Sequence, residues 1–97
     1  MKLNLDLAFV GEGHPQEALP QIAEAIRLRP EYAEAHAYYG AALSESGRLT
    51  EAVEEYRASL KINPRNADVH YQLGTTLRKL GRFDEAQAGF AAAGSGN

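Results

Sequence analysis

Apolar residues in the middle of the chain recur at the three- and four-residue intervals of an α-helix. Two such stripes follow one another: Tyr39, Ala42 and Leu43, then Ala52, Val53, Tyr56 and Leu60. Residues 33–46 contain no proline, Gly47 stands where a helix would end, and Thr50 is the expected N-cap of a second helix. Pro64 ends that helix because proline cannot continue the helical ladder, and Asp84 is expected to cap a later helix. The pattern predicts helices joined by short turns, with their apolar stripes facing each other.

The same pattern returns along the chain at a fixed interval. A shift of 34 residues superposes many identical or similar residues: Pro30 on Pro64, Ala33 on Ala67, His36 on His70, Gly40 on Gly74, Leu43 on Leu77, Gly47 on Gly81, Arg48 on Arg82, Glu51 on Glu85, Ala52 on Ala86 and Tyr56 on Phe90. So many coincidences at one offset indicate an internal repeat. The predicted organisation is a single repeat domain over residues 1–97. It comprises a degenerate unit at 1–30, a unit at 31–64, a unit at 65–93 that lacks its final proline, and a flexible tail at 94–97.

Two glycines, Gly40 and Gly74, occupy equivalent places inside predicted helices. A glycine there costs about 1 kcal/mol relative to alanine. Because this cost recurs at the same place, we expect another helix to approach closely at both positions. Ala52 and Ala86 supply small residues for such an approach, and the aromatic residue four positions after each fills the space beside it.

These residues resemble the tetratricopeptide repeat (TPR). The motif reads His36-x2-Tyr39-Gly40-x2-Leu43, Ala52-x3-Tyr56 and Pro64 in one unit, then His70-x2-Leu73-Gly74-x2-Leu77 and Ala86-x3-Phe90 in the next. His36 and His70 stand where the family often has tryptophan. The degenerate unit adds Pro15 and Pro20, and Pro20, near the fourth residue of its helix, predicts that this helix begins late or is kinked. The resemblance implies an all-α fold of antiparallel helix-turn-helix repeats, stacked in a short right-handed superhelix of about three repeats with a degenerate first repeat.

In the family that this sequence resembles, the first helices of the pairs line a concave groove that holds a peptide. Carried onto this sequence, the groove positions are Glu34, Ala37, Tyr38, Ala41, Glu45, Asp68, Tyr71, Gln72, Thr75, Arg78 and Lys79. Tyr38 and Tyr71 would offer flat contact area, and Gln72 would hydrogen-bond a ligand's backbone. The resemblance therefore implies a protein-protein interaction adaptor, a scaffold that binds a peptide or protein segment in this groove.

One branch of the family binds chaperones by gripping a terminal carboxylate with Lys, Asn and Arg at these positions. The sequence has Glu34, Tyr38, Asp68 and other residues there instead, so carboxylate-clamp binding is not expected. Arg78 and Lys79 would still attract an acidic segment.

Two histidines, His36 and His70, suggest a metal site or an acid-base pair. Equivalent residues of stacked repeats lie about 8–10 Å apart, too far for a shared ion, so a structural role is favoured. The acidic residues at 51, 54, 55, 84 and 85 fall near the starts of predicted helices, where carboxylates complement the helix dipole. The chain has no cysteine, and it lacks phosphate-binding loops, nucleophile elbows and zinc-ligand spacings. The sequence predicts no enzyme, no cofactor and no metal.

Composition narrows the class of partner. The 13 acidic and 10 basic residues are well mixed and give a net charge of −3, which argues against nucleic-acid binding. Apolar runs are far shorter than the roughly 20 residues that span a bilayer, so membrane insertion is not expected. The N-terminus has Asp6 within its apolar part and no small-residue cleavage site, so no secretion signal is expected. The cytoplasm is therefore the default location.

The two ends of the repeat array suggest an alternative function. Residues 1–10 alternate like a strand but also fit a helical face, and periodicity does not decide between the two. If the segment is helical, its outer stripe comprises Leu3, Leu7 and Val10. At the other end, Phe90 lies on an alanine-rich helix that no further predicted helix covers. Because apolar edges usually bind a partner, the alternative is a structural self-assembly module that stacks into homo-oligomers.

Overall fold

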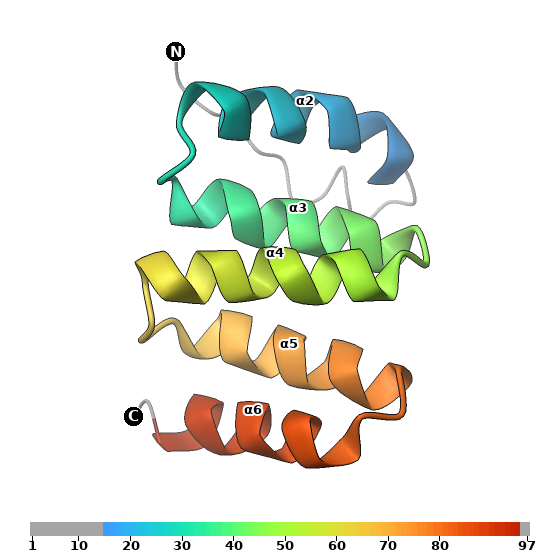
Figure 1. Cartoon of the computed structure of the whole chain (residues 1–97), viewed down its shortest axis with the longest axis vertical. Helices are drawn as coiled ribbons and strands as arrows, with labels where there is room; N and C mark the ends of the chain where they lie inside the picture. Colours follow the sequence, from blue (N-terminus) through green and yellow to red (C-terminus); the bar gives the residue numbers. More distant parts are fainter. Residues whose placement is uncertain (1–14, 96–97) are drawn as a thin grey trace.

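The computed structural model describes residues 15–95, which form five α-helices joined by short turns. The helices are α2 (Pro15–Leu28), α3 (Ala33–Glu45), α4 (Leu49–Ile62), α5 (Ala67–Lys79) and α6 (Phe83–Ser95). They lie side by side in the order of the sequence, each running opposite to its neighbour (Figure 1). Residues 15–95 contain no strand, and each of their helices falls short of the length and apolarity needed to cross a bilayer.

The helices associate as pairs. The closest neighbours are α3 with α4 and α5 with α6, while α2 packs on α3 and α4 packs on α5. In addition, α3 touches α5, so that the first helices of two successive pairs approach each other. The predicted all-α fold of stacked helix-turn-helix repeats is confirmed.

The core lies where these helices meet. Its main cluster comprises Leu43, Ala52, Val53, Tyr56, Leu60, Val69, Leu73, Leu77 and Ala86. A smaller cluster of Ile22 and Ala42 joins α2 to α3. Tyr56 is among the largest fully buried side chains, with 2% of its surface exposed. Tyr39 and Leu43 therefore do face the apolar stripe of α4, whereas Ala42, expected to do the same, packs on Ile22 of α2 instead.

An aromatic ring packs directly on the helical glycine within each pair. A Cβ atom added at Gly40 would lie 2.9 Å from ring carbons of Tyr56. One added at Gly74 would lie 2.9 Å from the ring of Phe90 and 3.0 Å from the carbonyl oxygen of Ala86. The expected close approach at both glycines is confirmed.

The turns within the pairs share one geometry. Gly47 and Gly81 adopt left-handed φ angles of 85° and 81°, which glycine reaches without steric cost. The N–H of Arg48 donates to the Leu43 carbonyl at 2.8 Å, and the N–H of Gly47 donates to the Ser44 carbonyl at 3.0 Å. This is the Schellman pattern that closes a helix C-terminus.

The predicted caps of the following helices are wrong. α4 begins at Leu49 and α6 at Phe83, so Thr50 and Asp84 lie inside their helices. The reason is that Arg48, the last residue of the turn, is also the N-cap of α4. Its carbonyl accepts the first helical hydrogen bond, from the N–H of Ala52 at 3.0 Å. Sequence reasoning placed each of these caps two residues too late.

The helical boundaries differ from expectation at both ends. α2 begins at Pro15 and continues through Pro20, so the predicted late start is wrong. Proline is well tolerated at the first helical position, and Pro20 removes only one ladder bond. At the other end, α6 continues to Ser95, two residues past the expected end of the last unit. The predicted stripe of Leu3, Leu7 and Val10 lies outside the described residues.

We expect Gly74→Ala to lower the free energy of unfolding by about 1–2 kcal/mol, because overpacking against a backbone carbonyl exceeds the gain in helix propensity. Gly40→Ala should cost less, since only the Tyr56 ring must move. Gly94→Ala is the matched control, because nothing lies within 4 Å of its added Cβ, and it should leave stability unchanged or higher. Urea unfolding measures all three. A Gly74→Ala chain as stable as the wild type would contradict the close approach.

Candidate peptide-binding groove

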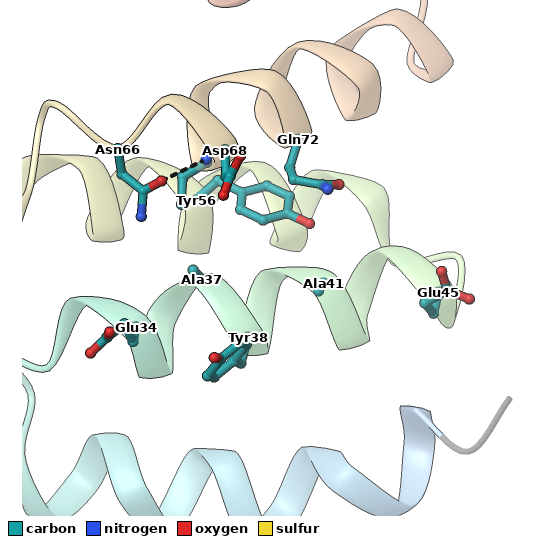
Figure 2. A pocket seen from close by; sticks show the side chains of 10 residues that line it. Glu34, Ala37, Tyr38, Ala41, Glu45, Tyr56, Asn66, Asp68 and Gln72 are labelled. Atoms are coloured by element: carbon teal, nitrogen blue, oxygen red, sulfur yellow. Dashed lines mark hydrogen bonds between the residues drawn. The ribbon is translucent and has the colours of Figure 1, made fainter. Parts of the chain in front are cut away.

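A groove of about 470 Å³ lies between α3 and α5, with α4 behind it. Its lining comprises Glu34, Ala37, Tyr38, Ala41, Glu45, Tyr56, Asn66, Asp68, Val69 and Gln72. Figure 2 shows α3 along one side and the start of α5 along the other.

The α3 wall is one face of a helix. Glu34, Ala37, Ala41 and Glu45 follow one another at intervals of three and four residues, which places them in a single row. Ala37 and Ala41, which lie between the two glutamates, are too small to fill the space in front of them. Tyr38 points toward α2 (Figure 2), where it packs against the Ile22 and Ala42 cluster.

Tyr56 of α4 reaches the groove from the core. Burial raises the pKa of its hydroxyl from the ordinary 10.0 to about 12, the negative charge of Glu45 acts in the same direction, and the hydroxyl of Thr76 opposes them. Thr76 is itself buried and donates to the Gln72 carbonyl at 2.9 Å. The phenol is therefore neutral at physiological pH and presents a polar group at the groove wall.

The α5 wall begins with a capped helix N-terminus. The Asn66 side chain accepts a hydrogen bond from the N–H of Val69 at 3.3 Å, drawn as the dashed line in Figure 2. This leaves the amide NH2 of Asn66 available at the groove edge. Asp68 and Gln72 follow on the exposed face of α5. The side-chain amides of Asn66 and Gln72 and the carboxylate of Asp68 thus line the α5 wall, opposite Ala37 and Ala41 of α3.

The charges of the groove are of one sign. Its lining contains Glu34, Glu45 and Asp68 and neither lysine nor arginine. Elsewhere, Arg48 pairs with Glu51, and Arg82 and Arg57 pair with Glu85. These pairs hold the pKa of Glu51 and Glu85 below the usual range, chiefly through hydrogen bonds from Arg48 and Arg82.

Seven of the predicted groove residues line this groove: Glu34, Ala37, Tyr38, Ala41, Glu45, Asp68 and Gln72. Tyr71 instead packs on Phe90, with ring centroids 5.4 Å apart, and Thr75 donates to the Tyr71 carbonyl of its own helix. Arg78 and Lys79 are exposed near the end of α5, outside the lining. That these four residues contact a ligand stays a prediction.

Three lining residues were missed by sequence reasoning: Tyr56, Asn66 and Val69. Tyr56 was assigned to the core alone, and its second role depends on the gap that Ala37 and Ala41 leave. Asn66 carried a usable signal, because asparagine just before a predicted helix is a typical N-cap and so lies at the edge of that helix.

The two histidines stabilise the turns between pairs. The Nε2–H of His36 donates to the Pro30 carbonyl at 2.7 Å, and His70 does the same to the Pro64 carbonyl at 2.8 Å. The Nδ1 of His36 also lies 2.8 Å from the Glu55 carboxylate. Among the described residues, no group of three or more potential ligands is placed to hold a metal ion. The structural role expected for the histidines is consistent with these contacts.

We expect alkaline pH to destabilise the fold through Tyr56. Below pH 10 the phenol is protonated in both the folded and the unfolded chain, so its contribution is constant. Between pH 10 and about 12 the unfolded chain loses the proton first, and stability falls, by roughly 2–3 kcal/mol in total. Tyr56→Phe should lose less stability over this range than the wild type, whereas Tyr71→Phe, altered at an exposed ring, should match it. Urea unfolding at a series of pH values tests this; equal losses in wild type and Tyr56→Phe would refute it.

Comparison with known proteins supports the repeat architecture. A family model described as tetratricopeptide repeat matches residues 9–58, and a second, described as TPR repeat, matches residues 40–81. No curated protein sequence matches the chain significantly.

Solved structures of MamA share the fold. MamA from MSR-1 is 23% identical with a TM-score of 0.85, covering 93% of this chain and 52% of that one. MamA from AMB-1 is 24% identical with a TM-score of 0.86, covering 94% and 54%. MamA from Desulfovibrio magneticus RS-1 is 18% identical with a TM-score of 0.86, covering 90% and 49%. The chain thus spans about half the length of these proteins. Since one family model matches more than half of the 97 residues and the helices pair as that family requires, the chain belongs to the tetratricopeptide repeat family.

Proposed function

We propose that the chain is a protein-interaction module that binds a peptide or protein segment in the groove between α3 and α5, with no catalytic activity of its own. The observation that carries this proposal is the pair Ala37 and Ala41, which leaves an open space between two helices where larger side chains would have filled it. The family and the fold agree with a repeat scaffold of this kind.

The chemistry of the groove suits a polypeptide. Its volume of about 470 Å³ lies within the roughly 300–1,000 Å³ typical of ligand sites. Ala37, Ala41 and Val69 supply apolar contact, and the amides of Asn66 and Gln72 offer donors and acceptors to a peptide backbone. Such groups suit any extended peptide, because every peptide carries backbone N–H and C=O groups for the amides to hydrogen-bond.

A second candidate, end-to-end self-assembly, is favoured by one observation. At the α5–α6 end, Tyr71 and Phe83 are 57% and 64% exposed. Phe90 is only partly exposed, because it packs against Gly74. However, α6 has the exposed Gln87 where α4 has the buried Val53, so the end face is less apolar than the face that α4 buries against α5. This difference is why groove binding is our first proposal.

We expect a displayed library of random decapeptides, selected on the immobilised protein, to yield binders that require the groove. Ala41→Trp fills the space between α3 and α5 and should abolish their binding. Ala88→Trp adds the same ring at an exposed position on α6 outside the lining and should leave binding unchanged. Selected peptides that bind Ala41→Trp as well as the wild type would exclude the proposed groove function.

We expect the solution mass to stay at the monomer value of 10.5 kDa across a concentration series measured by light scattering. A mass that rises with concentration in the wild type, and returns to the monomer in Phe83→Ser, would favour self-assembly through the α5–α6 end. Leu28→Ser, altered at an exposed apolar residue of α2, is the control.

A further inference from the structure

The three groove carboxylates lack partners among residues 15–95, the part of the chain that the structure describes. Glu34, Glu45 and Asp68 form no ion pair and no hydrogen bond among the described side chains, although Glu24, Glu51, Glu55 and Glu85 each contact a basic residue. No lysine or arginine lines the groove to offset them. The groove therefore concentrates negative charge that the fold does not neutralise.

Two of these carboxylates have a structural explanation. Glu34 and Asp68 stand at equivalent repeat positions in the first turns of α3 and α5. A carboxylate there interacts favourably with the positive end of the helix dipole. Their presence alone would not indicate a ligand.

Glu45 has no such explanation. It is the last residue of α3, a helix with no basic residue in its last turn, and a carboxylate at a helix C-terminus meets the negative end of the dipole. The equivalent residue of the next pair is Lys79, the type that the dipole favours. Glu45 also disfavours ionisation of the buried Tyr56. A residue that breaks a local rule of stability at the rim of a groove is typical of a binding site.

The spacing of the carboxylates defines the ligand further. Glu34 and Glu45 lie at opposite ends of α3 in Figure 2, eleven residues apart in sequence, which corresponds to about 16 Å along a helix. An extended peptide rises about 3.3 Å per residue, so about five residues cover this distance. Between the two carboxylates the peptide would lie over Ala37 and Ala41, opposite Asp68 and the amides.

We propose that the groove binds an extended peptide segment with two lysines or arginines about five residues apart, one reaching Glu34 and the other reaching Glu45, with small side chains between them. Asp68 adds to the attraction from the opposite wall. This inference rests on the proposed function, since it assigns the chemistry of the ligand to the same groove.

The test starts from the random decapeptide library described above. Selected sequences should be enriched in lysine and arginine at separations of four to six residues. One selected peptide is then synthesised with both basic residues unchanged, with both replaced by glutamine, and with both replaced by glutamate. Fluorescence anisotropy should show about tenfold weaker binding of the glutamine form and still weaker binding of the glutamate form, with differences that shrink as salt rises.

Protein variants separate binding from stability. Glu45→Gln should weaken the basic peptide several-fold while leaving the urea midpoint equal to or higher than that of the wild type, because an unfavourable charge at the end of α3 is removed. Glu54→Gln removes an exposed carboxylate of α4 that does not line the groove, and it should leave the affinity unchanged. An equal loss of affinity in both variants would overturn the assignment.

The remaining outcomes distinguish the two proposals. If selected peptides need the groove but are neutral or acidic, the charge inference fails and the proposed function stands. If no selected peptide is sensitive to Ala41→Trp, both fail. If spermine, a small polyamine, binds as tightly as the basic peptide and depends on Glu45 to the same degree, the site is one for small cations and the peptide inference is overturned.

Discussion

The packing of an aromatic ring on a helical glycine determines how each pair of helices is arranged. Where Tyr56 covers Gly40, and where Phe90 covers Gly74, the missing Cβ allows the two axes to approach closely. This contact draws α4 against the back of α3, which places the Tyr56 hydroxyl at the groove between α3 and α5. One packing contact therefore fixes both the core and the rear wall of the groove.

Much of the fold could be predicted because its determinants are local and repeated. The 34-residue period, the glycine that follows α3 and α5 and the glycine inside each of these helices all have the structural meaning that their positions suggested. The caps could not be predicted, because Arg48 and Arg82 are poor capping residues by type. Their place is set by the preceding Schellman turn, because Arg48 donates to the Leu43 carbonyl of one helix and its own carbonyl accepts from the N–H of Ala52 in the next.

The groove was only partly predictable for a different reason. Resemblance to the repeat family indicates which residues of α3 face the groove, so Glu34, Ala41 and Glu45 could be assigned from their repeat positions. It does not indicate which residues of other helices lie across the groove from α3. Asn66 enters the lining from a loop and Tyr56 enters from the core, and both depend on how three helices meet. Tyr71, which occupies the repeat position of Ala37, turns instead toward Phe90.

The connections in this array differ in length. Within the α3–α4 pair the turn comprises residues 46–48, and Arg48 is hydrogen-bonded to both helices that the turn joins. Between pairs, residues 63–66 form a longer link in which His70 binds the Pro64 carbonyl. The link does not separate two cores, because one apolar cluster contains residues of α3, α4, α5 and α6. Since the groove walls α3 and α5 belong to different pairs, the packing of this shared cluster sets the width of the groove.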